Sequence, residues 1–351
     1  MTPLAETAYY TRQTIKYGSI GLVVLIVGRF LVNAGITLYT RLNPPPPPPP
    51  TVGFGQLPRL SFPSNNPPKY NYILETVSGV ANTPSDRAPV YFMPIIRPNL
   101  LALERATETA ANMGFVFAPQ AITERLYRFS RTSPLPARLD FDIITGNFGM
   151  SVDWWTNDLF LQEKLLPNDN QAISEAKSFL NRADLLPSDL DDGLTKVSYL
   201  KASGRGYIGA LSLSEADFIQ VDFFREPIAD SFEVLTPSPQ EGIVRVIISG
   251  SRTQGQRLVW VKYDYFPVDL NNFETYPIKS GPQAWEELLA GQGYIISLAG
   301  QQPSATVRNV NLGYYDDFDP QNYLQPVYIF TGDNGFKAIV PAIEATWVQA
   351  E

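Results

Sequence analysis

The sequence predicts an α+β fold in which helix-plus-antiparallel-strand units repeat after an N-terminal transmembrane helix. Three observations predict it. An apolar segment of 23 residues, Tyr17–Tyr39, lies close to the N-terminus, and a run of seven prolines follows it. Beyond the prolines, stretches with helical periodicity alternate with stretches rich in Val, Ile and Tyr, which are typical of strands.

The apolar segment is long enough to cross a bilayer. As a helix it would measure about 34 Å, against roughly 30 Å of hydrocarbon. Residues 1–43 carry a net charge of +3 and the remainder carries −11, and a basic head stays in the cytoplasm. We therefore expect a single-pass protein of the cell membrane, with an extracytoplasmic body. Its expected parts are a cytoplasmic head at 1–14 and a transmembrane helix at 15–40. Residues 17–39 of this helix are expected to contact the lipid bilayer.

Two other interpretations of the apolar segment stay open. A cleaved signal peptide would use residues 17–28 as its apolar core and residues 32–34 as its cleavage site. A buried soluble helix is the other, although no two-sided pattern supports it. The single charge of the segment, Arg29, costs about 3 kcal/mol in the bilayer unless it snorkels or pairs with an acidic group of another helix. Snorkelling is the preferred interpretation, and we also name Arg29 as a candidate contact with a membrane partner.

A proline-rich spacer is expected at residues 41–68. Its core, Pro44–Pro50, favours polyproline II, which would span about 22 Å at 3.1 Å per residue. Gly, Ser, Asn and further Pro continue the spacer. A stiff standoff between membrane and body is the preferred interpretation, and a docking motif for a proline-binding module is the alternative.

The first α+β unit is expected at residues 69–166. Its expected elements are a strand at 72–80, a hairpin turn at 82–84, a strand at 90–93, a helix capped by Asn99, and strands at 125–130 and 138–144.

The same order of elements recurs in the second and third units, expected at residues 167–351. A helix capped at Asp169 or Asn170 ends by Pro187, and a third helix starts at Pro282, a residue suited to a first helical position. The remaining expected strands are 195–200, 217–224, 243–249, 258–265, 306–315, 327–331 and 336–340. Strands 243–249 and 258–265 are expected to form one hairpin, and strands 327–331 and 336–340 a second one around the turn at 333–335.

The third unit resembles a known family. A helix at 284–289 leads to the segment 307–315, which ends in Gly-Tyr-Tyr. The segment 324–330 with its Pro-Val pair follows, and the last strand ends at 338–342. This order is similar to the PepSY-like ectodomains of the YycH and YycI type, which are bacterial single-pass membrane regulators that restrain a sensor kinase. The resemblance covers roughly the last 70 residues; it implies a PepSY-like fold and a regulatory role, and the proline spacer departs from it.

Composition excludes several kinds of chemistry. The chain has no His and no Cys, so neither a His-based nucleophile system nor a thiolate site can be built. A net charge of −8 disfavours nucleic acid, which needs a concentrated basic face.

Short motifs offer an enzymatic alternative. Ser174 and Lys177 match the S-x-x-K pattern of penicillin-binding enzymes, and residues 279–281 mimic their K-[ST]-G. Chance produces such short matches often. The alternative is a cell-envelope hydrolase that uses carboxylates or this Ser/Lys pair.

Two further groups are candidate contacts. Asp316, Asp317 and Asp319 form an acidic turn that would suit Ca²⁺, although their spacing matches no known calcium loop and a solvated loop is the preferred interpretation. Dense aromatic residues suggest an exposed stripe for a partner or a glycan. The aromatic candidates for partner contact are Trp154, Trp155, Tyr314 and Tyr315.

Together these patterns favour a membrane-anchored, extracytoplasmic, non-catalytic protein. We expect it to bind, and to regulate, another envelope or membrane protein without a cofactor. A structural or glycan-binding surface module is the third interpretation.

Overall fold

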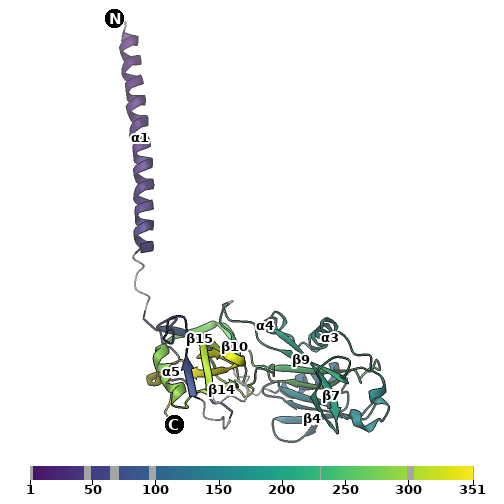
Figure 1. The fold of residues 1–351 in the computed structure, drawn as a ribbon. Coiled ribbons are helices and arrows are strands. Elements are labelled where there is room, and N and C mark those ends of the chain that lie inside the picture. Colours follow the sequence, from purple (N-terminus) through teal and green to yellow (C-terminus); the bar gives the residue numbers. More distant parts are fainter. Residues whose placement is uncertain are drawn as a thin grey trace. The chain divides into compact units, whose positions relative to one another are not determined.

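The computed structural model describes residues 3–42, 49–63, 71–94, 100–229, 231–298 and 304–350 (Figure 1). The chain divides into two compact units, Met1–Pro49 and Pro50–Glu351. We call the second unit the body. It combines helices with two large sheets, which confirms the α+β class. Most of the predicted proline run and the expected cap Asn99 lie outside the described residues.

The first unit contains helix α1, Pro3–Leu42. Among the described residues it is the one helix long and apolar enough to cross a membrane, and the candidate span covers Thr11–Tyr39. The span contains no proline, which would interrupt the helix, and Leu22–Val27 forms a continuous apolar run near its centre. The side chains of the span are exposed around almost the whole helix.

One sheet of the body has nine strands, and all its neighbouring strands are antiparallel. In spatial order the strands are β3 (Gln120–Ala121), β4 (Leu126–Arg131), β5 (Ala137–Asp142), β6 (Phe148–Val152), β12 (Leu258–Tyr263), β11 (Val244–Ser249), β9 (Phe218–Phe223), β7 (Thr195–Ser203) and β8 (Gly206–Gly209).

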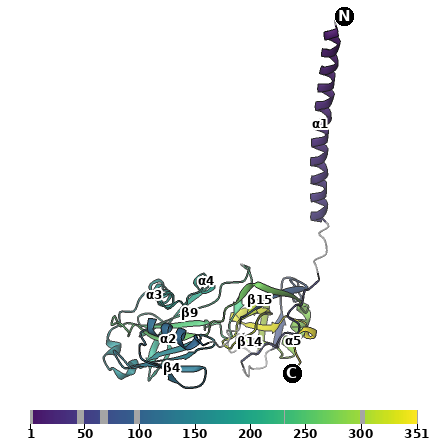
Figure 2. The same ribbon diagram turned by 180° about the vertical axis from the view of Figure 1, so that it is seen from behind.

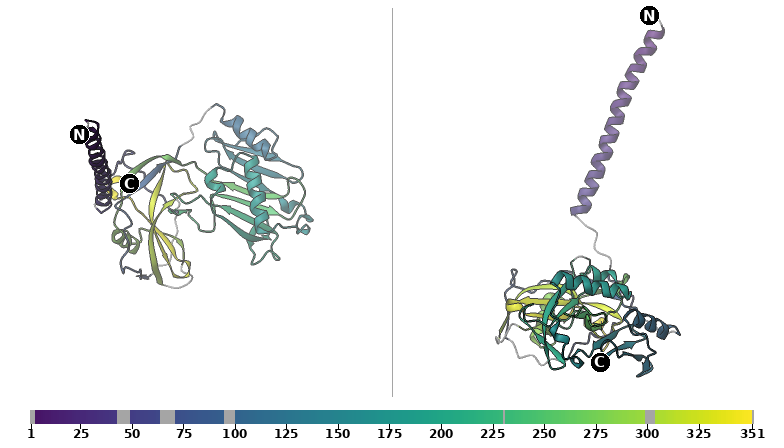
Figure 3. Two further views of the ribbon diagram at one scale, coloured as in Figure 1. Left: turned by 90° about the horizontal axis from the view of Figure 1, so that it is seen from above. Right: turned by 90° about the vertical axis from the view of Figure 1, so that its right-hand side faces the viewer.

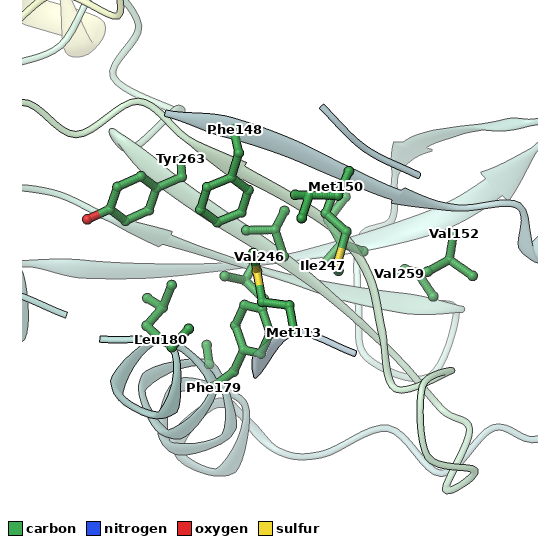
Figure 4. Packing of buried hydrophobic residues seen from close by; sticks show 14 of the residues in the cluster. Met113, Phe148, Met150, Val152, Phe179, Leu180, Val246, Ile247, Val259 and Tyr263 are labelled. Atoms are coloured by element: carbon green, nitrogen blue, oxygen red, sulfur yellow. The ribbon is translucent and has the colours of Figure 1, made fainter. Parts of the chain in front are cut away.

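Helices α2 (Ala102–Asn112) and α3 (Asp169–Arg182) pack on this sheet (Figures 2 and 3). Figure 4 shows Phe179 and Leu180 of α3 pointing toward strand residues such as Val246, with Met113 beside Phe179. These side chains belong to the largest buried apolar cluster of the described residues. Burying each of them stabilises the fold by about 1.5–3 kcal/mol.

The second sheet has eight strands and is covered by α5, Gly281–Leu289. Its main path is β1 (Asn71–Leu74), β15 (Ser304–Tyr315), β16 (Tyr323–Gly332), β17 (Lys337–Pro341) and β14 (Tyr294–Ser297). Off this path lie β2 (Arg87–Phe92), which pairs with β16 and β13 (Asp269–Pro277), and β10 (Val234–Leu235), which pairs with β15. The short helix α4, Ser188–Asp191, lies in the chain between α3 and β7, and so between two strands of the nine-stranded sheet.

The chain passes between the two sheets repeatedly. It leaves the eight-stranded sheet after β2, returns for β10, leaves again for β11 and β12, and finishes in β13 to β17. Strands of the expected first unit and of the expected later units therefore share both sheets. The domain boundaries at 69–166 and 167–351 stay predictions, and the hydrogen-bonded sheets extend across them.

The predicted hairpin at residues 72–93 is wrong. Strand β1 pairs in parallel with β15, and β2 pairs with β13 and β16, so the two strands are not neighbours. Val90 and Tyr91 are both buried, and a strand buried on both faces needs neighbours and covering layers that one hairpin cannot supply.

The predicted helices and the C-terminal hairpins agree better with the structure. Helix α3 begins one residue after its cap, Asn168, which forms a capping box with Gln171. This cap lies one or two residues before the predicted one. Helix α5 has Pro282 in its first turn, as expected, and is capped by Ser280. The expected antiparallel pairs β11–β12 and β16–β17 are confirmed.

Candidate binding pocket

A pocket of about 620 Å³ opens on the nine-stranded sheet, beside helices α2 and α3. We call it the Arg131 pocket. Its walls come from the C-terminal end of α2, one face of α3, the end of β4 and the loop between β11 and β12. It lies within the 300–1,000 Å³ range of small-molecule sites.

The base of the pocket is apolar. Met113, Met150 and Phe179 are almost fully buried members of the main core cluster, and Leu258 is partly buried against it. We call these four residues the apolar floor. Because core packing fixes them, the floor is a preformed surface.

The rim of the pocket is cationic. It contains Arg131, Arg182 and Arg257, with a single carboxylate, Glu175. Glu175 is already engaged, because Arg257 donates to its two oxygens from Nε at 2.8 Å and from Nη2 at 2.9 Å. Among the described residues, Arg131 and Arg182 therefore have no carboxylate partner, on a body whose overall charge is negative.

Arg131 has an unusual environment. Its Nη2 donates to the carbonyl of Gly255 at 2.6 Å, and its Cζ lies 5.1 Å from the centroid of the Phe115 ring. Its Nε is buried and finds no hydrogen-bond partner among the described residues. Burial lowers the pKa of this guanidinium, because desolvation disfavours the charged form.

Two glycines give the guanidinium its space. Gly114 and Gly255 both have positive φ, 88° and 80°. A Cβ at Gly114 would lie 3.2 Å from Nη1 of Arg131, and one at Gly255 would lie 3.5 Å from the same atom. Gly114 therefore combines a left-handed backbone with close approach to the charge, whereas the nearest atom to a Cβ at Gly255 would be Pro134 Cδ at 3.1 Å.

A second charged cluster is centred on Arg225, which follows β9. It is 6% exposed. Arg225 Nε donates to Asp316 Oδ2 at 3.0 Å, Nη2 donates to the Phe266 carbonyl at 2.8 Å, and Nη1 pairs with Asp189. Burial disfavours its charge, but the two carboxylates outweigh burial and raise the pKa of Arg225. Because its partners lie in the protein, we assign this cluster a structural role.

The structure does not bring the Ser/Lys pair together as a catalytic unit. Ser174 of α3 lines the Arg131 pocket, whereas Lys177 Nζ pairs with Asp191 Oδ1 at 2.7 Å. Among the described residues no hydrogen bond joins Ser174 to Lys177. Such a bond would be needed for Lys177 to take the hydroxyl proton.

The side chains of Asp316 and Asp317 in the acidic turn bind different partners within the body. Asp316 is held by Arg225, and Asp317 Oδ1 accepts from the backbone N–H of Phe318 at 2.8 Å. Burial raises the pKa of Asp317. Within the described ranges no group of three or more carboxylates converges on one point that would suit a metal ion. Calcium binding at Asp316, Asp317 and Asp319 stays a prediction.

The aromatic candidates lie mostly inside the body. Trp154, Tyr314 and Tyr315 are 3%, 1% and 0% exposed, and Trp154 Nε1 donates to the Tyr207 hydroxyl at 3.1 Å. Partner contact through these three rings would require the body to open. Trp155 is half-buried, and Arg205 Cζ lies 6.0 Å from its ring centroid. These contacts stay predictions, as does that of Arg29, which is exposed on α1.

Sequence reasoning missed Arg131, Arg182 and Arg257. They lie far apart in the chain, and the fold alone brings them to one pocket. The available signals were weak: Gly114 after a helix and Gly255 in a hairpin loop both indicate turns, but neither indicates a charge beside it.

Comparisons with known proteins leave the chain without an assigned family. No protein-family model matches it, and no curated protein matches it. A solved structure, that of an uncharacterized protein from Eubacterium rectale ATCC 33656, aligns with 78% of this chain and 89% of its own length. The alignment has 12% sequence identity and a TM-score of 0.33, which is too low to establish a shared fold.

Proposed function

We propose that this chain is a membrane-anchored, extracytoplasmic, non-catalytic protein that binds and regulates another membrane or envelope protein. The observation that carries the proposal is α1, a separate unit whose span is apolar around its whole circumference but contains Arg29. A helix of this kind anchors the chain and at the same time needs a partner for its charge.

The position of Arg29 supports a protein partner. It lies ten residues before Tyr39, about 15 Å along the helix, and so near the middle of a bilayer whose far face is at Tyr39. Snorkelling from this depth is costly. An acidic side chain on a neighbouring helix would remove the cost.

A row of glycines on α1 supports close packing of a second helix. Gly21, Gly28 and Gly35 recur every seven residues, so they share one face. Apart from the chain neighbours and the backbone of α1 itself, no atom of the described residues lies within 4 Å of a Cβ built at any of the three. Small residues on one face let helix backbones approach closely in a membrane.

The body supports binding better than catalysis. Lys177, the base that the S-x-x-K pattern would supply to Ser174, is instead engaged by Asp191. The hydrolase and the glycan-binding module therefore remain the weaker alternatives.

We also propose that the body is built from PepSY-like repeated units. Support comes from α2, α3 and α5, each of which precedes antiparallel strands in the chain and packs on a sheet. Superposition of the three units in an experimental structure tests this. A shared order of helix and paired strands supports repetition, and three different orders contradict it.

The partner proposal is tested by exchanging the span. In cells that make the full chain, residues 17–39 are replaced by an unrelated apolar helix, and a second variant carries Arg29→Leu. Co-purification from native membranes measures association. We expect the exchange to abolish a specific association and Arg29→Leu to weaken it. Unchanged association in both variants would overturn the proposal.

A further inference from the structure

We propose that the Arg131 pocket binds a small organic acid, with the carboxylate held by the guanidinium groups at the rim and an aliphatic chain lying on the apolar floor. This goes beyond the proposed function, because it depends on the body and not on α1.

The pocket has more positive than negative charge, with three arginines and one carboxylate among its lining residues. Of its three arginines, only Arg257 has a carboxylate, and Glu175 provides it with two hydrogen bonds. Arg131 and Arg182 have none among the described residues. An anion that enters the pocket therefore meets two guanidinium groups whose charge the protein has not balanced.

The guanidinium of Arg131 adds a free hydrogen-bond donor. Its Nη2 donates to the Gly255 carbonyl and its Nε is buried, but its Nη1 has no hydrogen-bond partner among the described residues. A carboxylate that enters the pocket can accept from this N–H group, and Arg182 lines the same pocket. A bound acid would therefore use a donor that the folded chain leaves free.

The apolar floor favours a ligand in which the carboxylate is attached to an aliphatic chain. Met113, Met150, Phe179 and Leu258 give a chain of methylene groups a surface that excludes water, and each buried methylene contributes about 0.8 kcal/mol. Inorganic anions gain nothing from this surface. The size of the pocket, about 620 Å³, favours a free acid over an extended segment of a partner protein.

Glu175 provides a variant that should improve binding. Its carboxylate occupies Arg257, so Glu175→Gln adds a third unbalanced arginine to the pocket. We expect affinity for the acid to rise. A gain of affinity distinguishes the proposal from simple damage to the fold, which would only lower it.

The test uses the full chain in nanodiscs of zwitterionic phosphatidylcholine, with octanoate as the probe and isothermal titration calorimetry as the measurement. Octan-1-ol is the matched neutral ligand. We expect octanoate to bind at least tenfold more tightly than octan-1-ol, Arg131→Gln to weaken octanoate at least tenfold, and Glu175→Gln to strengthen it severalfold. Arg308→Gln, at an exposed arginine of β15, is the control and should leave binding unchanged.

Several results would overturn the proposal. They are equal binding of acid and alcohol, weaker binding by Glu175→Gln, or displacement of octanoate by an equal concentration of inorganic phosphate. Tighter binding of the peptide acetyl-Ala-Ala-Leu than of octanoate, lost when its C-terminus is amidated, would overturn the small acid in favour of a peptide terminus. None of these results affects partner binding by α1, which is measured separately.

Discussion

At the scale of single residues, Arg225 shows how the body places a charge in its interior. Its guanidinium is surrounded by the carboxylates of Asp316 and Asp189 and by the carbonyl of Phe266. Arg225 follows a strand of the nine-stranded sheet, and Asp316 follows a strand of the eight-stranded sheet. The pair therefore connects two elements 91 residues apart in the chain.

Removing Arg225 should be costly. Arg225→Met leaves two carboxylates without their cation, and loss of one partner of a buried pair costs about 3–5 kcal/mol. Urea unfolding at pH 7 measures this loss of unfolding free energy. Arg225→Met combined with Asp316→Leu should recover part of the loss. Arg308→Gln, at an exposed arginine, is the control, and an equal effect of Arg225→Met and Arg308→Gln would contradict the structural role.

Asp222 predicts a dependence of stability on pH. It is 1% exposed, accepts from Gly242 N at 3.0 Å and from Gln220 Nε2 at 2.8 Å, and burial raises its pKa above 3.8. Between pH 3.8 and the raised pKa of Asp222, the folded protein keeps a proton that the unfolded chain has released. Ionisation of Asp222 therefore lowers the free energy of unfolding as pH rises through this interval. The penalty is complete above the raised pKa and absent below about 3.8.

Asp222→Asn should therefore raise the melting temperature at pH 7, because the amide keeps one acceptor and carries no charge. The difference from wild type should disappear near pH 3.5. Thermal unfolding across the pH range measures both. A lower melting temperature for the variant at pH 7 would show that the ionised carboxylate is favourable here.

Residues of this kind are the hardest to predict from sequence. Nothing near Arg131, Arg225 or Asp222 in the chain distinguishes them from ordinary surface charges. Their burial follows from strands that meet across long separations. Sequence patterns report local periodicity and turn chemistry, which leave such contacts undetermined.

At the scale of elements, α3 forms one wall of the Arg131 pocket, and the stability of this helix depends on the cap of its first turn. Asn168 Oδ1 accepts from Gln171 N at 3.0 Å, and the Gln171 side chain accepts from Asn168 N at 3.1 Å. This capping box satisfies N–H groups that the helix itself leaves free.

Asn168→Ala should lower the free energy of unfolding by about 1 kcal/mol, the usual cost of losing such a cap. Asn170→Ala, two residues further into the helix, is the control and should change little. Chemical denaturation distinguishes them. If the two variants were equally stable, the cap would not support α3.

Helices were predicted better than strand pairing. The spacing of apolar residues and the caps located the first residues of α3 and α5 within one or two residues, whereas α3 ends at Arg182, before the predicted stop at Pro187. The partners of β1 and β2 were missed, because β15, β16 and β13 lie more than 170 residues away in the chain. Pairing over such distances is decided by the packing of the whole body.

At the scale of the whole molecule, the chain joins a helix long and apolar enough to cross a membrane to a body that we propose to be extracytoplasmic. The candidate span was predictable from composition and length, because an apolar run of this size has few structural alternatives. The fold class was predictable as well. The distribution of the chain over two sheets was not, because no local signal marks the points where the chain leaves one sheet for the other.

The absence of native cysteine allows a clean test of orientation. Val77→Cys, at an exposed position of the body, should react with a membrane-impermeant maleimide in intact cells. Thr2→Cys, in the predicted cytoplasmic head, should react only after permeabilisation. The reverse labelling pattern would place the body in the cytoplasm.

The central claim is that α1 binds another membrane protein through the face that includes Gly28 and through Arg29. Photocrosslinking in living cells tests it most directly, with a photoreactive residue at Val32 on the glycine face or at Val23 on the opposite face. The account predicts one discrete protein adduct from position 32, absent from position 23 and lost in Arg29→Leu. Equal adducts from both positions, unaffected by Arg29→Leu, or no adduct from either, would contradict it.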